Sequence, residues 1–342
     1  MWKAIATIGA WTWLKEYEFG VTTEVDVAEA YRPLYVLRYA FWGIFVLLAA
    51  SAVAIFVFTI IVSKLNRTAR KAALDAKQLG QYELEEKIGA GGMGVVYKAC
   101  HSMLRRPTAL KLLDIDKTTD ATIARFEREV RLTSQLNHPN TIAVYDFGRT
   151  PEGIFYYAME YLDGLTLDDL VEQHGPQPEG RVIHILNQLC GSLIEAHGVG
   201  LIHRDVKPAN IIVNRRGGMF DVVKLLDFGL VKAVDAKKEA ALTAAGSITG
   251  TPLYVSPEGI ERPDDVDARS DLYAVGAVGY FLLTGQPVFE GQSVVEICMH
   301  QVQTPPVPPS ERLGTAISTD LENVILKCLA KKPRDRYASA QE

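Results

Sequence analysis

Two stretches of the chain decide the fold: LIHRDVKPANIIV at Leu201–Val213 and VKLLDFGL at Val223–Leu230. Each contains an apolar run that predicts a strand, and together they carry the polar residues Asp205, Lys207, Asn210 and Asp227. Mg²⁺ on a nucleotide takes few protein oxygens, which Asn210 and Asp227 can supply while phosphate completes the shell. Asp205 is not needed as a ligand and is free to accept a hydroxyl proton.

A glycine-rich segment lies upstream, in the run YELEEKIGAGGMGVVYKAC that begins at Tyr82. Gly89, Gly91 and Gly94 form GxGxxG, a spacing that lets backbone N–H groups approach phosphate oxygens. Dinucleotide-binding turns share these letters but join a strand to a helix. Here the β-forming residues Val95 and Val96 follow, so we predict a strand, a phosphate-covering loop and a second strand.

A lysine within an apolar run supplies a further charge. Lys111 lies in PTALKLL, and a lysine buried there needs an anionic partner, although it could also snorkel from an edge strand. The segment Thr122–Leu136 has helical spacing and places Glu129 near its apolar edge. Glu129 is the partner we predict for Lys111; a helix-surface carboxylate is the alternative.

Taken in this order, the motifs resemble the protein kinase superfamily, specifically the bacterial serine/threonine kinases that are similar to the eukaryotic ones. The resemblance covers residues 82–342. It implies an α+β, two-lobed kinase fold with a small β-rich lobe over about residues 82–160 and a larger helical lobe after it. It also implies ATP with Mg²⁺, or Mn²⁺ in its place, and protein substrates.

The resemblance carries roles to individual residues. Asp205 and Lys207 are implied as catalytic, with Asp205 as the base, and Asn210 and Asp227 as metal ligands. The nucleotide-binding residues it implies are Ile88, Gly89, Ala90, Gly91, Gly92, Met93, Gly94, Val95, Val96, Lys111, Glu129, Met159, Glu160 and Leu162, with Val96, Ala109 and Ile212 lining the adenine. Lys207 and Thr251 are the residue types that mark Ser/Thr rather than Tyr kinases in this family.

The resemblance also implies structural and regulatory parts. Glu258 and Arg336 match an ion pair between the activation segment and the C-terminal lobe, and Asp271 matches the brace of the catalytic loop. Between Asp227 and Glu258 the chain has few bulky apolar residues, and Arg204 precedes the base. We therefore expect autophosphorylation on this segment, at Thr243 or Thr249 first, with an unregulated flexible loop as the alternative.

A membrane segment precedes this domain. Residues 39–63, YAFWGIFVLLAASAVAIFVFTIIVS, carry no charged residue and exceed the roughly 20 residues that a membrane-spanning helix needs. Cations concentrate on the C-terminal side, at Lys64, Arg67, Arg70, Lys71 and Lys77. This asymmetry predicts a single-pass protein of the cell (inner) membrane, in contact with the lipid bilayer, with a cytoplasmic kinase domain.

The parts that flank this helix are short. Residues 1–38 are predicted to be a small extracytoplasmic tail, loosely ordered rather than lying on the membrane surface, and residues 64–81 a basic juxtamembrane linker with helical composition. Small residues at 49–54 would let two membrane helices approach closely, which makes a homodimer one expectation, although alanine is also ordinary lipid-facing filler.

Composition and motifs argue against other classes of protein. The 342 residues carry 36 Lys and Arg against 41 Asp and Glu, so the net charge of −5 gives no reason to expect a nucleic-acid partner. Four scattered cysteines suggest reduced thiols rather than disulfides or zinc. A pseudokinase scaffold would lack one of the catalytic residues, and a small-molecule phosphotransferase would lack the long segment between Asp227 and Glu258.

Three features of the sequence depart from the family pattern. Ser256–Glu258 reads SPE in place of APE, which we expect to be harmless. The membrane helix precedes the kinase domain, whereas it follows that domain in the best-known bacterial receptor kinases, so their sensing mechanism is not transferred. The chain stops at SAQE, where the family continues into another helix, which leaves open a truncated kinase domain.

Overall fold

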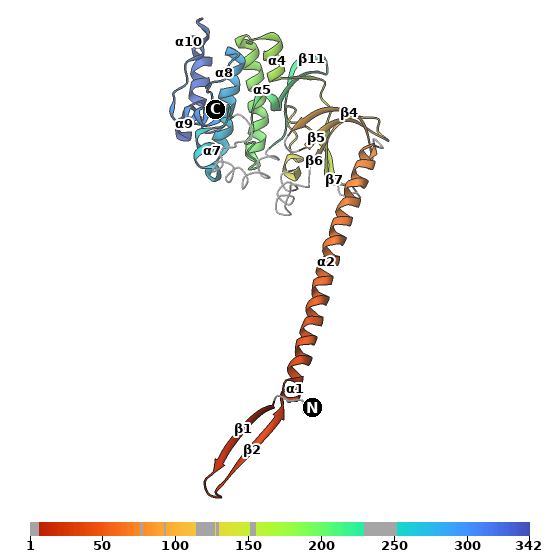
Figure 1. Cartoon of the computed structure of the whole chain (residues 1–342). Coiled ribbons are helices and arrows are strands. Elements are labelled where there is room, and N and C mark those ends of the chain that lie inside the picture. The colour runs from red at the N-terminus through yellow and green to blue at the C-terminus, as the bar shows by residue number, and fades with distance from the viewer. Residues whose placement is uncertain are drawn as a thin grey trace. The chain divides into compact units, whose positions relative to one another are not determined.

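The computed structural model describes residues 7–75, 78–91, 94–113, 127, 130–150, 155–228 and 252–342 (Figure 1). The chain divides into two compact units, Met1–Ala72 and Ala73–Glu342. The predicted α+β, two-lobed fold is confirmed, and one candidate membrane helix precedes the second unit in the chain.

The first unit begins with a β-hairpin. Strands β1 (Thr7–Leu14) and β2 (Phe19–Asp26) pair antiparallel, with Leu14 opposite Phe19 at the turn. The expectation of a loosely ordered tail is therefore wrong over these residues. The reason is that alternating apolar and polar residues form a paired ladder even where the large apolar side chains, such as Trp11, stay exposed.

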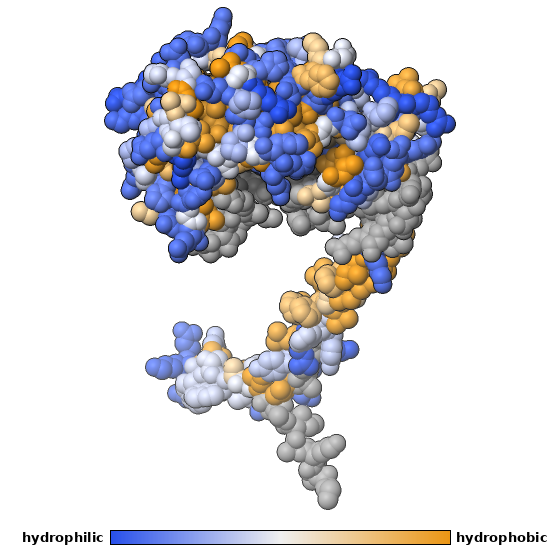
Figure 2. All heavy atoms as spheres, turned by 90° about the horizontal axis from the view of Figure 1, so that it is seen from above, coloured by the Kyte–Doolittle hydropathy of each residue, from blue (hydrophilic) through white to orange (hydrophobic). Residues whose placement is uncertain are grey.

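A single long helix follows the hairpin. After α1 (Val27–Ala30), helix α2 runs from Arg32 to Asp75 and contains Val36–Leu65, which is long and apolar enough to cross a membrane; its most apolar 18-residue window has a mean hydropathy of 2.9. Where its atoms are coloured, Figure 2 shows mostly apolar side chains along this rod. Ser51 and Thr59 donate hydrogen bonds to carbonyls of their own helix, at 2.8 Å each, so their hydroxyls add no unsatisfied polar groups.

The second unit starts with a six-stranded antiparallel sheet in the order β3-β4-β5-β6-β8-β7. Its strands are β3 (Gln78–Leu79), β4 (Tyr82–Gly91), β5 (Gly94–His101), β6 (Pro107–Leu113), β7 (Val144–Arg149) and β8 (Phe155–Glu160). The first strand lies within the predicted linker, so ordered structure begins before the predicted boundary at Tyr82. One face packs a small apolar cluster around Leu79, Leu84 and Leu110.

The larger lobe is mainly helical. Its elements are β9 (Gly164–Thr166), α4 (Leu167–His174), α5 (Glu179–Gly198), η2 (Pro208–Asn210), β10 (Ile211–Arg216), β11 (Met219–Leu225), α7 (Pro257–Glu261), η3 (Pro263–Asp265), α8 (Ala268–Thr284), α9 (Val294–Gln303), α10 (Pro309–Leu313), α11 (Thr319–Cys328) and η4 (Pro333–Asp335). Helix α8 is buried along most of its length. A Cβ on Gly276 would lie 2.6 Å from the Cβ of Cys328, so glycine allows α8 and α11 to pack closely.

The core of this lobe forms around α5 and α8 and extends to the hairpin of β10 and β11. Leu189 and Leu193 of α5, Tyr280 of α8 and Val223 of β11 are fully buried in one apolar cluster. The hairpin therefore packs on a dense apolar core. The two stretches Leu201–Val213 and Val223–Leu230 form its strands or lie directly next to them in the sequence.

Candidate active site

The hairpin of β10 and β11 brings the two predicted metal ligands to the same end. Ile211 pairs with Leu225, so Asn210 just precedes one strand and Asp227 follows the other. The main-chain N–H of Leu226 donates to the carbonyl of Asn210 at 2.9 Å and closes this end. Asp227 has a φ of +51°, a left-handed conformation that turns the chain sharply at this residue.

The predicted base lies beside the same loop. Asn210 Nδ2 donates to Asp205 Oδ2 and to the Asp205 carbonyl, both at 2.8 Å, and Lys207 Nζ lies 2.8 Å from Asp205 Oδ2. The Asp205 side chain is about one fifth exposed, so a hydroxyl group can reach it. Three of the four predicted residues of the loops are therefore in direct contact.

A buried carboxylate fixes the catalytic loop. Asp271, which is 1% exposed, accepts hydrogen bonds from the main-chain N–H groups of His203 and Arg204 at 2.8 Å each, and lies 2.8 Å from His197 Nε2. Arg204 has a φ of +65°, a conformation that these bonds hold in place. The predicted bracing role of Asp271 is confirmed.

The loop is also tied to the segment that bears Asp227. The fully buried ring of His203 donates from Nε2 to the carbonyl of Leu226 at 2.7 Å, accepts from the N–H of Asp205 at 3.2 Å and packs against Phe228. Burial lowers the pKa of His203, so the ring stays neutral with its proton on Nε2. A neutral ring with this tautomer satisfies both contacts.

Lys111 pairs with Asp227. Its Nζ lies 2.6 Å from Asp227 Oδ2, and both side chains are largely buried. The predicted partner Glu129 lies outside the described residues. The other carboxylate oxygen, Asp227 Oδ1, is buried and has no hydrogen-bond partner among the described residues.

This orphaned oxygen fits a cation. A carboxylate oxygen from Asp227 and the amide oxygen of Asn210 are hard donors of the kind that Mg²⁺ prefers. The described residues contain no group of three or more His, Cys, Asp or Glu that could hold a metal unaided. Such a pair of ligands suits a metal whose remaining ligands come from phosphate and water.

The glycine-rich loop joins two paired strands, as predicted. Gly89 lies opposite Val96, Ala90 opposite Val95 and Gly91 opposite Gly94. Gly92 and Met93 lie outside the described residues, and Ile88, at the edge of the loop, is half exposed. A Cβ on Gly89 would make only ordinary contact with Val96, at 3.8 Å, so the fold itself does not require glycine there. Glycine leaves the main chain at this position open to the approach of a ligand.

The predicted adenine lining comes together in part. Ala109 and Met159 are buried in one apolar cluster, and Val96 and Leu162 pack against it. Leu226, which the sequence analysis did not single out, packs there too. Ile212 lies on β10 opposite Thr166 and Lys224 and is not among the residues of this cluster.

Glu160 has a role that the sequence analysis missed. Its side chain is 3% exposed, lies 2.5 Å from Lys224 Nζ, pairs with Arg216 and accepts from the N–H of Ala143 at 2.8 Å. Burial alone would raise the pKa of Glu160, but these partners lower it overall. Any contact of Glu160 with a nucleotide must therefore come from its main chain. One signal was present, because Lys224, like Lys111, is a lysine within an apolar strand.

A second missed group lies where the segment after residue 251 enters the lobe. Gln301 of α9 is fully buried, and its Nε2 donates to the carbonyls of Pro252 at 3.1 Å and Leu253 at 2.7 Å. Tyr273 of α8 donates its hydroxyl to Gln301 Oε1. Gln301 therefore fixes this segment to the helical core.

The predicted pair at the other end of that segment is confirmed. Arg336 donates from its two Nη atoms to the two carboxylate oxygens of Glu258, at 2.6 and 2.7 Å. Both side chains are almost completely buried. Arg336 also lies over the ring of Tyr273, which connects this pair to the Gln301 contacts.

Comparisons with known proteins identify the family of the chain. The family model "Protein kinase domain" matches residues 82–342. The serine/threonine-protein kinase pkn3 of Myxococcus xanthus is 45% identical over 264 residues, which are 76% of this chain and 48% of that protein. The serine/threonine-protein kinase PknB of Mycobacterium tuberculosis is 43% identical over 266 residues, 77% of this chain and 41% of PknB.

A solved structure gives the same result for the fold. The crystal structure of the PknI kinase domain of Mycobacterium tuberculosis superposes with a TM-score of 0.60 at 27% identity and covers 77% of this chain and 94% of that one. This chain spans less than half the length of the curated relatives that it matches. The chain belongs to the protein kinase family, among its bacterial, eukaryotic-like serine/threonine kinases.

Proposed function

We propose that the chain is a membrane-anchored serine/threonine protein kinase that transfers the γ-phosphoryl group of ATP to serine or threonine hydroxyls of proteins. The observation that carries the proposal is the contact of Asp205 with Asn210 and Lys207, next to the pair of Lys111 and Asp227. These contacts support a site in which a base, a cation and two metal-binding oxygens face one space.

Each residue has a task in this reaction. Asp205 Oδ2 accepts the proton of the attacking hydroxyl, and Lys207, 2.8 Å away, offsets the negative charge that develops near it. Lys111 binds phosphate oxygens, and the main chain of the glycine-rich loop covers them. Asn210 and Asp227 hold Mg²⁺, or Mn²⁺ in its place, which supplies neutralisation of the phosphate charge when bound. The apolar cluster of Ala109 and Met159 takes the adenine and excludes water.

The membrane anchor is the span Val36–Leu65 of α2. The lysine and arginine residues that follow it favour a cytoplasmic kinase unit and an extracytoplasmic hairpin, so the chain would be a single-pass protein of the cell (inner) membrane. Cell fractionation tests this proposal, because the chain should remain with membranes after a carbonate wash. Protease added on the extracytoplasmic side should cleave only residues before the span. Release by the wash would contradict the anchor.

The segment after Asp227 is proposed to be an autophosphorylation site, at Thr243 or Thr249 first. Residues 229–251 lie outside the described part of the chain, and support comes from Arg204, whose main chain is fixed by Asp271 next to the catalytic base. After incubation with ATP and Mg²⁺, phosphopeptide mapping should find phosphate on one of these threonines. Active protein without modification between residues 229 and 251 would overturn this part of the proposal.

A homodimer is proposed for this step, so that one copy modifies another. The specific rate of autophosphorylation should then rise with the surface density of the chain in vesicles. A rate per molecule that is independent of density would show that each copy modifies itself.

Gln301 is proposed to position the segment that receives a protein substrate. Gln301→Leu would leave the carbonyls of Pro252 and Leu253 buried without their donor. We expect the KM for a protein substrate to rise by about tenfold, since both hydrogen bonds to the segment are lost, while the KM for ATP stays unchanged. Gln303→Leu, an exposed position on the same helix, is the matched control. Equal effects on both KM values would indicate a general loss of structure.

A further inference from the structure

Two turns of the kinase unit share an unusual composition. The turn between β5 and β6 carries Met103, Leu104, Arg105 and Arg106, and the turn between β10 and β11 is flanked by the strand ends Arg215, Arg216, Met219 and Phe220. Each turn thus presents two apolar residues beside two arginines. Among the large apolar side chains described in this unit, these four are the most exposed, at 85% for Met103, 70% for Leu104, 66% for Met219 and 70% for Phe220.

The first turn is held rigidly. His101 Nδ1 accepts hydrogen bonds from the N–H groups of Met103 and Leu104, at 3.3 and 3.2 Å, and the carbonyl of His101 accepts from the N–H of Arg105 at 2.8 Å. Arg105 adopts a φ of +50° in this turn. Because the main chain is fixed, the exposed apolar side chains project from an ordered support.

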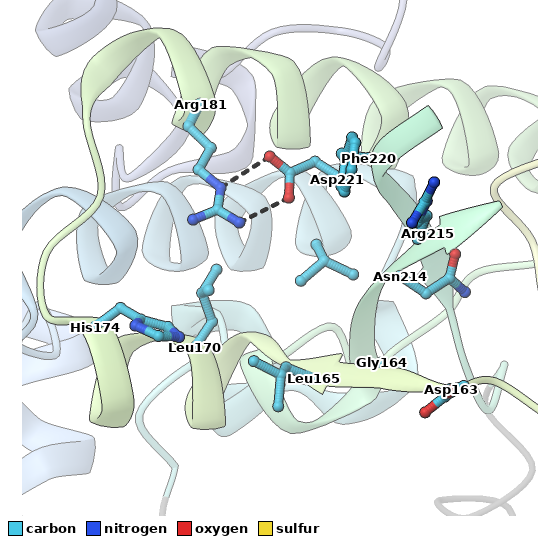
Figure 3. Close-up of a pocket in the computed structure, with 11 residues that line it drawn as sticks. Asp163, Gly164, Leu165, Leu170, His174, Arg181, Asn214, Arg215, Phe220 and Asp221 are labelled. Carbon is cyan, nitrogen blue, oxygen red and sulfur yellow. Dashed lines mark hydrogen bonds and ion pairs between the residues drawn. The ribbon is translucent and has the colours of Figure 1, made fainter. Parts of the chain in front are cut away.

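An ion pair holds the second turn in place. Arg181 of α5 forms a two-pronged ion pair with Asp221, at 2.9 and 2.7 Å, just after the turn (Figure 3). This pair lines an open pocket of about 320 Å³. Arg215 and Phe220 stand together at its margin in Figure 3, with the guanidinium 4.9 Å from the ring centre. A stacked arginine and phenylalanine combine charge and apolar surface at one point.

Tyr145 lies between the two turns. Arg106 lies over the ring of Tyr145, 3.7 Å from its centre, and donates to its hydroxyl. Tyr145 lies two residues after Ala143, whose N–H donates to Glu160, and Glu160 in turn pairs with Arg216. Arg106 and Arg216 therefore border a single surface, which we call the arginine-turn surface, made up of the two turns and Tyr145.

The arginine-turn surface keeps a positive balance. The single charge of Glu160 is shared between the buried Lys224 and Arg216, so this group keeps one unit of positive charge. Arg105 has only a loose partner in Glu83, at 3.7 Å, with both side chains exposed. Asp163 lines the same pocket as Arg215, and Asp221 is already neutralised by Arg181.

The chain enters the kinase unit beside this surface. The N–H of Ser102 donates to the carbonyl of Gln81 at 2.9 Å, and the rings of Tyr82 and His101 meet edge to face. The candidate span ends at Leu65, and the first strand of the unit begins at Gln78. Only residues 66–77 therefore separate the proposed anchor from the strand that leads into β4 and the first turn.

We propose that the arginine-turn surface docks on the anionic cytoplasmic face of the membrane, with Met103, Leu104, Met219 and Phe220 entering the headgroup layer and the arginines binding lipid phosphates. Exposed apolar residues flanked by cations are the combination that an anionic interface selects. The inference rests on the proposed membrane anchor. Docking would restrict how the tethered kinase presents its active site.

The test uses residues 78–342, because every buried apolar residue of the described chain lies at Leu79 or later and the unit therefore carries its own core. This segment has no tryptophan, so Leu104→Trp and Phe220→Trp each give a single reporter. On vesicles of 70% phosphatidylcholine and 30% phosphatidylglycerol, both reporters should shift their emission to shorter wavelength. Val324→Trp, an exposed position on α11, should not shift.

Charge-reversal variants show whether vesicle binding depends on the arginine-turn surface or only on the net charge of the segment. Arg105→Glu with Arg215→Glu should weaken vesicle binding by roughly thirtyfold, whereas Arg262→Glu with Arg334→Glu, an equal change of net charge at exposed positions, should weaken it less than threefold. Both variants should retain phosphoryl transfer, which shows that they are folded. Fractionation of the full chain tests the anchor separately, so the two proposals can fail independently.

Two results would overturn the inference. One is equal weakening of vesicle binding by the two pairs of substitutions, which would mean that only net charge matters. The other is reporters that respond to polyglutamate but not to the vesicles, which would assign the surface to an acidic protein partner.

Discussion

Replacing Asp227 by asparagine is expected to lower phosphoryl transfer by about a thousandfold, the scale on which a site loses a charge-stabilising group. Asp227 both pairs with Lys111 at 2.6 Å and points its second oxygen, buried and unpartnered among the described residues, at the proposed metal site. Asparagine keeps the shape and tolerates the φ of +51°, so the loss is one of charge. ATP binding should then lose its dependence on Mg²⁺.

Isothermal titration of ATP with and without Mg²⁺, together with a transfer assay, measures this prediction. The matched control is Asp221→Asn, since Asp221 is also an aspartate at positive φ, +54°, in the same hairpin, but pairs with Arg181 away from the site. The control should transfer phosphate at close to the normal rate. An Asp227→Asn protein whose affinity for ATP still rises with Mg²⁺ would remove Asp227 from the metal site.

The second large effect concerns stability. Arg336→Met should lower the free energy of unfolding by about 3–5 kcal/mol, because it leaves the carboxylate of Glu258 buried without its partner. For a unit of this size the melting temperature should fall by roughly 10 °C. Arg334→Met, three quarters exposed and two residues away, should change the stability by less than about 0.5 kcal/mol.

Urea unfolding of the kinase unit measures the free energy of unfolding, and thermal unfolding measures the melting temperature. A double variant, Glu258→Gln with Arg336→Met, should be more stable than Arg336→Met alone, because the uncompensated charge is gone. If the double variant were the less stable of the two, the cost would lie in the other contacts of Arg336 and not in the ion pair.

The same pair predicts a dependence on pH. Burial alone would raise the pKa of Glu258, but its bonds with Arg336 lower it overall from the usual 4.5. A carboxylate whose pKa is lower in the folded state stabilises the fold above its unfolded pKa, and this contribution is lost as the pH falls through the folded value. In Arg336→Met the acid side of the stability profile should therefore be flatter than in the parent.

The sequence was sufficient for the parts of the site that lie in contiguous motifs. Asp205, Lys207 and Asn210 are separated by a few residues, so their contact follows once the loop forms. Asp227 comes to the same end because a hairpin pairs the strands on either side of its turn. The expected partner of Lys111 was Glu129, which lies outside the described residues, whereas the partner that the structure shows is Asp227.

Other features could not be predicted because they join distant residues. The contact between buried Glu160 and Lys224, to which Arg216 adds a more exposed charge, spans 64 positions and depends on how β8 lies against β11. Gln301 reaches Pro252 across 49 positions, and nothing in the local pattern of α9 distinguishes it from Gln303. The hairpin Thr7–Asp26 was missed because the sequence argument weighed the size of a possible core and not the alternation of the residues.

One measurement tests the central claim most directly: transfer of label from γ-labelled ATP to serine or threonine of a protein substrate, by the full chain with Mg²⁺ and by Asp205→Asn beside it. The parent should transfer label, and the variant should bind ATP normally but transfer about a thousandfold more slowly, since it lacks the base. Equal rates for the two proteins, or no transfer by a parent that binds ATP and Mg²⁺, would contradict the claim that Asp205 and its neighbours form a working kinase site.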